Sequence, residues 1–167
     1  MKTIITVSAV FNCSLERAFK TPILGDATQF LVGYGPVPAV VRFSDDETWG
    51  KPGGHRIPHS AKSLLSPGGP IGIDRVYERI ENHYWKWGVT EFSQWSMGFT
   101  AFMGEVHFVE VSPNGIAVTW TYTLISNSAI VYPAQWLFGQ LFWRGQMRHG
   151  IIRMKQYAES NTPLLYA

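Results

Sequence analysis

Residues 116–125 read IAVTWTYTLI, in which large apolar side chains alternate with small or hydroxylated ones. A period of two is the pattern of a β-strand that places one face in a core. The large apolar face carries Ile116, Val118, Trp120, Tyr122 and Leu124. The other face carries Ala117, Thr119, Thr121 and Thr123. We therefore predict a strand whose apolar face packs against a second layer of structure.

This strand is one arm of a predicted hairpin. The tetrapeptide SPNG at 112–115 has turn-forming residues at every position, and Phe102–Val111 precedes it. Neither parity of Phe102–Val111 is clean, so its register is left open. A second hairpin is predicted from Asp74–Glu81 and Tyr84–Phe92, which flank Asn82-His83. Consecutive hairpins favour an antiparallel sheet with one buried face.

The hydrophobic period changes after Pro133. Residues on one helical face recur at steps of three and four: Trp136, Gln140, Trp143, Met147, Ile151, Met154 and Ala158. The pattern predicts one helix from about Ala134 to Ser160, roughly 40 Å long at 1.5 Å per residue. Three glycines on it, Gly139, Gly145 and Gly150, each weaken a helix by about 1 kcal/mol relative to alanine. Close packing against the sheet and local flexibility both remain as explanations.

The remaining segments complete an α+β fold. Strands are expected at Ile4–Asn12, at Ala39–Ser44 and, as an edge strand because Pro58 lacks an N–H, at His55–Ala61. Between the first two strands, short helices are expected at Leu15–Lys20 and from Pro22 to about Leu31. We expect a curved antiparallel sheet of six to seven strands wrapped around a long C-terminal helix, in a single domain spanning 1–167.

Composition restricts the functional classes. The chain has 167 residues, 46% of them hydrophobic and 14% aromatic, which argues against disorder. The net charge of +2 is too balanced to indicate a nucleic-acid partner. No apolar stretch is long enough to predict a transmembrane segment. The N-terminal apolar run contains Thr and Ser and fits a strand better than a signal peptide, so we expect a cytoplasmic protein, and a homodimer is left open.

These features resemble a known superfamily. The carriers are the order of strands and helices, VYERIE at 76–81, PNGI at 113–116 leading into VTW at 118–120, and the long terminal helix. Together they resemble the START-like (SRPBCC) superfamily, which includes polyketide cyclases, plant pollen allergens and plant hormone receptors and has the helix-grip fold. The resemblance implies a cavity between sheet and helix that takes lipids, hormones or polyketides. The chain lacks the Gly-rich phosphate-type loop of the allergens, and no receptor gate motif is recognisable in Gly50–Pro70.

Glu78 is the candidate polar group of that cavity. Strand alternation from Val76 places Glu78 and Ile80 on the inner face, where an acid among apolar neighbours must be paired, protonated or near water. The resemblance also implies that a Glu in the similar segment of receptor members lies near the ligand. The predicted ligand-binding residues are Val76, Glu78, Ile80, Val118, Trp120, Tyr122, Trp136, Gln140, Trp143 and Met147.

The leading functional hypothesis is binding of a small hydrophobic or aromatic molecule, lipid-like or polyketide-like, without a cofactor. A polyketide cyclase or dehydratase using Glu78 or a tyrosine as acid and base is the first alternative. The second is a protein-interaction module that uses Trp85, Trp87 and Trp95.

Two further expectations concern the segment between the strands. His55 and His59 are four residues apart, but Pro58 and the flanking glycines argue against a helix and no third ligand is apparent, so no metal site is predicted. The glycine- and proline-rich stretch Gly50–Pro70 is expected to rim the cavity mouth together with Ser93–Thr100.

Overall fold

A computed structural model describes residues 1–94 and 96–166 of the chain. In this part of the chain one antiparallel sheet runs in the order β1-β8-β7-β6-β5-β3-β2, with β4 paired to β3. Its strands are β1 (Lys2–Asn12), β2 (Val40–Ser44), β3 (His55–Ser60), β4 (Gly69–Pro70), β5 (Ile73–Ile80), β6 (Tyr84–Thr90), β7 (Phe99–Ser112) and β8 (Gly115–Ser126). Both predicted hairpins are present, and the strand beyond the predicted six or seven is the two-residue β4.

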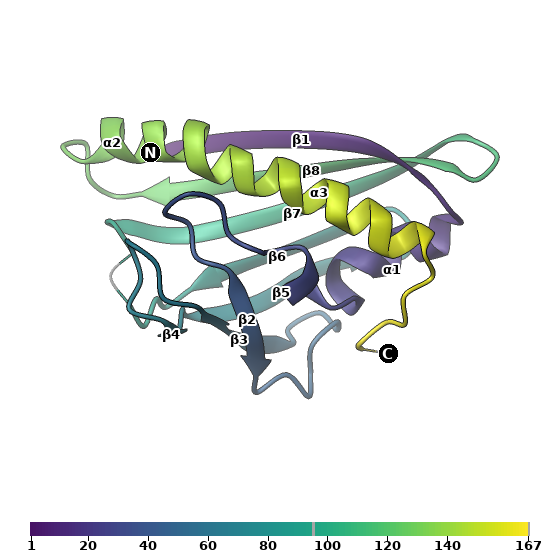
Figure 1. Cartoon of the computed structure of the whole chain (residues 1–167), viewed down its shortest axis with the longest axis horizontal. Helices are drawn as coiled ribbons and strands as arrows, with labels where there is room; N and C mark the ends of the chain where they lie inside the picture. The colour runs from purple at the N-terminus through teal and green to yellow at the C-terminus, as the bar shows by residue number, and fades with distance from the viewer. Residues whose placement is uncertain (95, 167) are drawn as a thin grey trace.

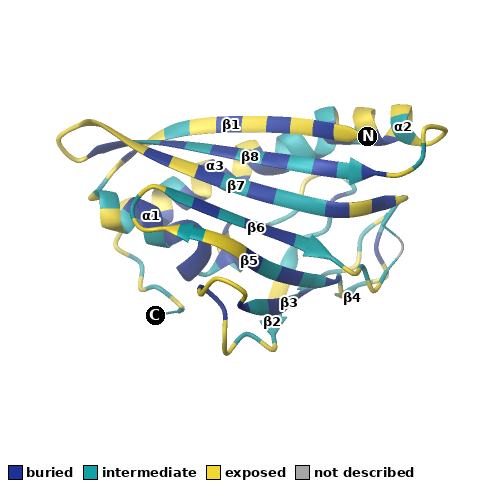
Figure 2. Cartoon of the chain, turned by 180° about the vertical axis from the view of Figure 1, so that it is seen from behind, coloured by how far each residue is buried: buried dark blue, intermediate teal, exposed yellow. Residues whose placement is uncertain are grey.

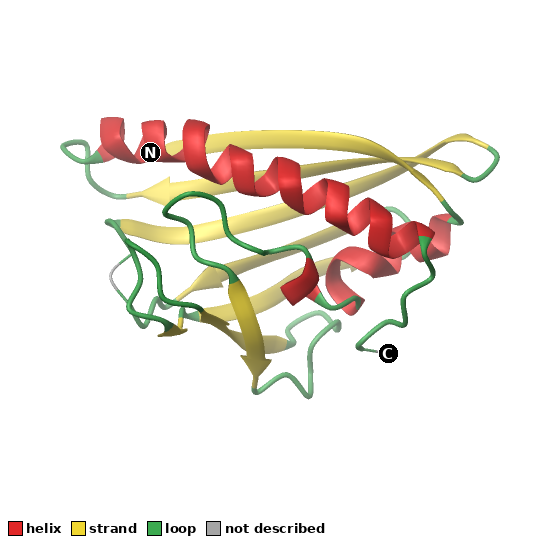
Figure 3. Cartoon of the chain, in the orientation of Figure 1, coloured by secondary structure: helices red, strands yellow, loops and turns green. Residues whose placement is uncertain are grey.

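The helices lie on one face of this sheet. They are α1 (Leu15–Leu24), the 3₁₀ turn η1 (Ala27–Gln29), and a continuous C-terminal helix made of α2 (Tyr132–Phe138), the π-helical segment η2 (Gly139–Trp143) and α3 (Arg144–Glu159). Figures 1 and 3 show this long helix crossing in front of the sheet, with α1 near its C-terminal end. The predicted α+β class, a sheet around a long C-terminal helix, is confirmed. No helix of the described ranges is long and apolar enough to cross a membrane.

The alternation of β8 is confirmed along its whole length. Every residue of its predicted apolar face is buried, and the residues between them are half-buried, as the banding in Figure 2 shows. Trp120 is only 2% exposed, and its ring packs beside Gly150 of α3. The neighbouring strand β7, whose register was open, buries Gly104, Val106 and Phe108.

The π-helical segment changes which residues of the terminal helix face the sheet. A π turn adds one residue to a turn of helix and therefore shifts the buried stripe on its far side by one position. Met147, Ile151, Met154 and Ala158 are buried as predicted. In α2 and at the start of η2, however, Gln135 and Gly139 face inward, while Trp136 is 48% exposed and Gln140 is half-buried. The prediction of Trp136 and Gln140 on the buried face is therefore wrong.

Close packing accounts for the three helix glycines. A Cβ atom at Gly139 would lie 2.9 Å from Thr3 Cγ2 of β1, and one at Gly150 would lie 3.1 Å from Trp120 Cζ3. A Cβ at Gly145 would overlap the ring of Tyr34. The glycines thus let the helix approach both the sheet and the loop before β2.

Two predictions based on proline are wrong. Helix α1 continues through Pro22, because Thr21 to Leu24 are all buried and this packing outweighs the lost backbone hydrogen bond. The expected second helix shrinks to the 3₁₀ turn η1. Strand β3 is not an edge strand, since β2 pairs with it on one side and β5 on the other. Pro58 is tolerated because β5 pairs only with His55 and Arg56.

The C-terminal segment folds back onto α1 and carries a pH-dependent contact. The backbone N–H groups of Leu165 and Tyr166 donate to Leu24 O at 2.8 and 3.0 Å, and the Tyr166 hydroxyl donates to Asp46 Oδ2 at 2.7 Å. Burial, and then the hydrogen bond to Asp46, raise the pKa of Tyr166 to about 12.

We expect part of the alkaline loss of stability to arise from Tyr166. An unfolded tyrosine has a pKa of about 10. Because the folded pKa is higher, this contribution is complete below about pH 10 and is lost as the pH rises toward about 12. Tyr166→Phe should therefore lose less stability than the wild type between these pH values, as measured by urea denaturation. Equal pH slopes in the two proteins would contradict this assignment.

Candidate functional site

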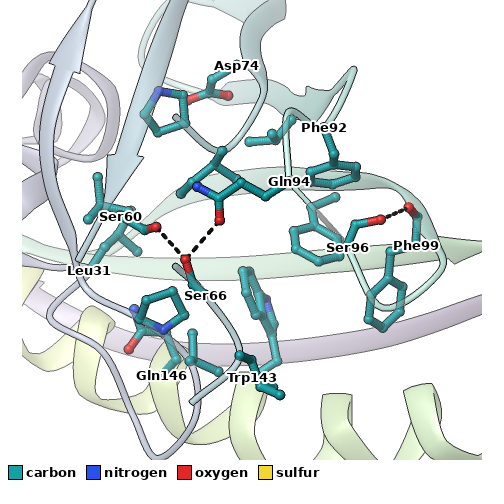
Figure 4. A pocket seen from close by; sticks show the side chains of 18 of the residues that line it. Leu31, Ser60, Ser66, Asp74, Phe92, Gln94, Ser96, Phe99, Trp143 and Gln146 are labelled. Carbon is teal, nitrogen blue, oxygen red and sulfur yellow. Dashed lines mark hydrogen bonds between the residues drawn. The ribbon is translucent and has the colours of Figure 1, made fainter. Parts of the chain in front are cut away.

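A cavity of about 170 Å³ lies between the sheet and the terminal helix. Its walls come from strands β2, β3, β5, β6, β7 and β8, from the helix segments α2, η2 and α3, and from four loops. The described lining residues are Leu31, Pro36, Val37, Pro38, Val40, Phe43, Arg56, Pro58, Ser60, Leu65, Ser66, Ile71, Asp74, Trp87, Val89, Phe92, Gln94, Ser96, Met97, Phe99, Phe102, Tyr122, Phe138, Trp143 and Gln146. Figure 4 shows Asp74 on one side of this cavity and Trp143 and Gln146 on the opposite side.

Aromatic rings form a connected wall of the cavity. Trp143 of the helix packs against Phe102 of β7, with ring centroids 4.8 Å apart, and against Tyr122 of β8 at 5.3 Å. Tyr122 in turn meets Trp87 of β6 edge to face at 6.0 Å. Such rings offer a ligand large apolar surfaces and favour aromatic partners in edge-to-face or offset geometry.

A buried ion pair is the charged feature of the site. Arg56 of β3 and Asp74 of β5 are direct partners in the sheet, and Arg56 Nε donates to Asp74 Oδ2 at 3.1 Å. The two residues are 3% and 4% exposed. The guanidinium carbon of Arg56 lies 3.7 Å from the ring centroids of both Phe43 and Trp49, which hold it from two sides. Burial raises the pKa of Asp74, and Arg56 offsets part of this rise.

Tyr122 is a hydrogen-bond donor in this setting. Burial, followed by the nearby negative charge of Asp74, raises the pKa of its phenol well above the usual range. Its oxygen accepts a hydrogen bond from Trp87 Nε1 at 3.2 Å. The hydroxyl group therefore keeps its proton near neutral pH and is able to donate a hydrogen bond to an acceptor in the cavity.

Hydrogen bonds join the end of β3 to two of the lining loops. Ser66 Oγ lies 2.9 Å from Ser60 Oγ and donates to Gln94 Oε1 at 2.8 Å, while Gln94 Nε2 donates to Pro70 O at 2.7 Å. Figure 4 shows the chain from Ser60 through Ser66 to Gln94. Both predicted rim stretches thus supply lining residues, and their place at the cavity mouth stays a prediction.

Comparison with solved structures places this architecture. No family model matches the chain, and no curated protein matches it in sequence. TTHA0849 from Thermus thermophilus superposes with a TM-score of 0.69 at 10% identity over 96% of this chain and 99% of that one. Ara h 8.0201 gives 0.65 at 11% identity over 96% and 100%. Norcoclaurine synthase from Thalictrum flavum, in complex with dopamine and hydroxybenzaldehyde, gives 0.63 at 11% identity over 98% and 90%.

The chain has the helix-grip fold. This confirms the resemblance drawn from the sequence at the level of fold, since identities this low carry no more than the fold. Within the helix-grip fold the cavity occupies the predicted place, between the sheet and the C-terminal helix.

The ten predicted ligand-binding residues divide into three groups. Tyr122 and Trp143 line the cavity. Val76, Val118, Trp120 and Met147 are buried in the core beside it and are not among its lining residues. Glu78, Ile80 and Trp136 are exposed, and Gln140 is half-buried and accepts a hydrogen bond from Arg144 at 2.5 Å.

A β-bulge explains why Glu78 and Ile80 face outward. Val76 pairs with Trp87, but Glu78 pairs with Lys86, so Tyr77 is an extra residue in β5. The bulge reverses the alternation after Val76. Arg79 then turns inward, with its guanidinium carbon 4.8 Å from the ring centroid of Trp85. The prediction that Glu78 faces the cavity is therefore wrong.

We expect Glu78→Gln to leave both stability and ligand binding unchanged. Exposed substitutions away from special features usually change the free energy of unfolding by no more than about 0.5 kcal/mol. Thermal unfolding and a ligand titration, each compared with the wild type, check this expectation. A clear loss of affinity would show that Glu78 acts on the cavity despite its exposure.

Arg56, Asp74 and Gln146 are three polar lining residues that sequence reasoning missed. Asp74 shares the parity of Val76 on the same strand, so the alternation itself carried a signal. Buried Arg56 alternates with the half-buried His55 and Ile57. Gln146 directly precedes Met147 of the buried stripe, and it is 3% exposed.

The structure also places the tryptophans and histidines that the sequence analysis singled out. Trp85 and Trp87 are buried, so they cannot serve as exposed anchors of an interaction surface, and Trp95 lies outside the described residues. His55 and His59 lie on strand β3, where His59 Nε2 is 2.9 Å from Ser44 Oγ. Within the described ranges no cluster of three or more His, Cys, Asp or Glu side chains is placed to hold a metal ion.

Proposed function

We propose that this protein binds a small molecule built on one aromatic or similarly apolar ring in the cavity between sheet and terminal helix. The observation that carries the proposal is the aromatic wall of Trp87, Phe102, Tyr122 and Trp143 around about 170 Å³ of space. An apolar cavity of about 150 Å³ in another protein takes up benzene. The size favours a single ring over a long acyl chain.

The fold comparison supports the same size class. The Thalictrum flavum norcoclaurine synthase was solved with dopamine and hydroxybenzaldehyde, both of which are single-ring aromatic compounds. The shared fold is what links these ligands to the present chain, and it supports our proposal of an aromatic ligand.

Native mass spectrometry of the protein purified from its own source tests the proposal directly. We expect a bound molecule with the mass of a one-ring compound. The second readout is the melting temperature in the presence of toluene, because a ligand that binds the folded state alone raises it. The proposal would be overturned if no bound molecule were detected and toluene did not raise the melting temperature.

Filling the cavity should abolish binding. Val89 lines it, and Val89→Phe places an added ring in the space of the ligand. We expect toluene to raise the melting temperature of the wild type but not that of Val89→Phe, although overpacking itself costs about 1–3 kcal/mol of stability. The matched control is Val109→Phe, the same change at an exposed position of β7, which should retain the response. A full toluene response in Val89→Phe would place the binding elsewhere.

The enzymatic alternative keeps one of its two candidate groups. Glu78 is exposed, whereas Tyr122 lines the cavity. The raised pKa of Tyr122 makes it a hydrogen-bond donor and a poor base near neutral pH. Binding therefore remains the function that we propose.

A further inference from the structure

We propose that the ligand carries a neutral polar group with a hydrogen-bond donor next to an acceptor, as in a carboxamide, and that this group docks on Arg56 and Asp74. The inference rests on the proposed function, because it names the chemical class of the molecule that the cavity takes. It goes beyond a hydrophobic cavity by assigning a polar anchor.

Unpartnered polar atoms are concentrated at the cavity. In the described residues, eight buried side-chain nitrogen or oxygen atoms have no hydrogen-bond partner in the protein. Four belong to lining residues: Arg56 Nη1, Asp74 Oδ1, Trp143 Nε1 and Gln146 Oε1. Buried polar groups are nearly always hydrogen-bonded, so such a cluster on one cavity indicates a polar partner within it.

The ion pair itself leaves a donor nitrogen and an acceptor oxygen buried without a partner. Arg56 Nε and Asp74 Oδ2 bond each other at 3.1 Å, which leaves Arg56 Nη1 and Asp74 Oδ1. Strand pairing sets the two residues opposite each other, and the rings of Phe43 and Trp49 keep the guanidinium in place. A group that both accepts and donates is the complement of such a pair. The carbonyl oxygen of an amide would accept from Arg56 Nη1, and its N–H would donate to Asp74 Oδ1.

The opposite wall also has one unpartnered donor nitrogen and one unpartnered acceptor oxygen. Trp143 offers the donor Nε1, and Gln146 offers the acceptor Oε1. An anion would need donors on both walls, and a cation would need acceptors. Among these four unpartnered atoms, each wall instead presents one donor nitrogen and one acceptor oxygen, which matches a neutral ligand.

The net charge of the cavity lining also favours a neutral ligand. Arg56 and Asp74 are the only charged side chains among the described lining residues, and their charges cancel. Because the guanidinium cannot lose its proton, the Asp74 carboxylate is the neighbour that balances it. A charged ligand would add an unpaired charge to a buried site, which is costly. A neutral amide adds none and gains hydrogen bonds to charged groups.

Four compounds with the same ring test the inference on the full chain: toluene, benzamide, benzoate and benzylamine. We expect calorimetric titration near pH 7 to show benzamide binding about 10- to 100-fold tighter than toluene. Benzoate and benzylamine should bind more weakly than benzamide. Equal affinities for benzamide and toluene, or tighter binding of either ion, would overturn the inference. Absence of binding by all four compounds would instead overturn the proposed function.

Asp74→Asn gives a readout that a purely structural role would not produce. The variant keeps the shape of the side chain but leaves the charge of Arg56 unbalanced in the cavity. We expect the order of affinities to invert, with benzoate gaining and benzamide losing. A folded variant with the wild-type order would overturn the inference. If the variant does not fold, the four wild-type titrations decide the question alone.

Discussion

Replacing Asp74 by alanine is expected to lower the free energy of unfolding by about 3–5 kcal/mol. The change removes the carboxylate that pairs with Arg56 and leaves a guanidinium that is only 3% exposed. That cation has aromatic rings on both faces and is shielded from bulk solvent. Most of the cost is the unpaired buried charge, and the lost hydrogen bond is the smaller part. Urea denaturation of the wild type and the variant measures the difference.

A double variant separates the ion pair from simple packing. In Arg56→Met with Asp74→Leu both charges are gone, and apolar side chains of similar size take their place. Replacing a buried pair in this way is often neutral or stabilising, so the double variant should recover most of the loss. A double variant as unstable as Asp74→Ala would show that the pair acts through its shape and not through its charge. Because the pair is the proposed polar anchor, the stable double variant should also bind benzamide no better than toluene.

Trp85→Ala is expected to cost about 3–5 kcal/mol, the range for deleting a large buried ring. Trp85 of β6 is fully buried and stacks on Phe19 of α1, with ring centroids 4.9 Å apart and planes 15° from parallel. Its Nε1 also donates to Phe19 O at 2.8 Å. The ring therefore ties α1 to the sheet both by packing and by a buried hydrogen bond. Thermal and urea unfolding should agree on the size of the loss.

Trp136→Ala is the matched control for this prediction. It makes the same chemical change on the exposed face of α2, and we expect a change of no more than about 0.5 kcal/mol. Similar losses in the two variants would mean that exposure does not govern the cost of removing tryptophan here. That result would also contradict the register of the helix before the π turn.

Reasoning from the sequence succeeds for regular strands and fails where a strand contains a bulge. A regular alternation such as 116–125 identifies a strand and its buried face, because each side chain position follows directly from the pleat. All five predicted inner residues of that strand are buried. The same argument fails in β5, where the bulge at Tyr77 shifts every later residue to the other face. Nothing local in VYERIE distinguishes a bulge from a regular strand.

The terminal helix repeats this contrast. Its C-terminal half has the predicted buried stripe, while the π-helical segment moves the stripe from Trp136 and Gln140 to Gln135 and Gly139. The helix adopts this register in the folded chain because Gly139 permits close contact with Thr3 and Ile5 of β1, residues more than a hundred positions away. A contact of that kind is not visible in a helical period.

The fold was easier to predict from the sequence than the residues of the site, because those residues are brought together by tertiary structure. Tyr122 and Trp143 were predictable because each belongs to a regular apolar face. Periodicity and turn chemistry within short windows were enough for the α+β class, both hairpins and the terminal helix, whereas the cavity was predicted from the resemblance to a superfamily. Which acid is buried depends instead on contacts between distant segments. Asp74 lies inside, and Glu78 lies outside, because one extra residue separates them in the ladder and because the neighbouring strand brings Arg56 opposite Asp74.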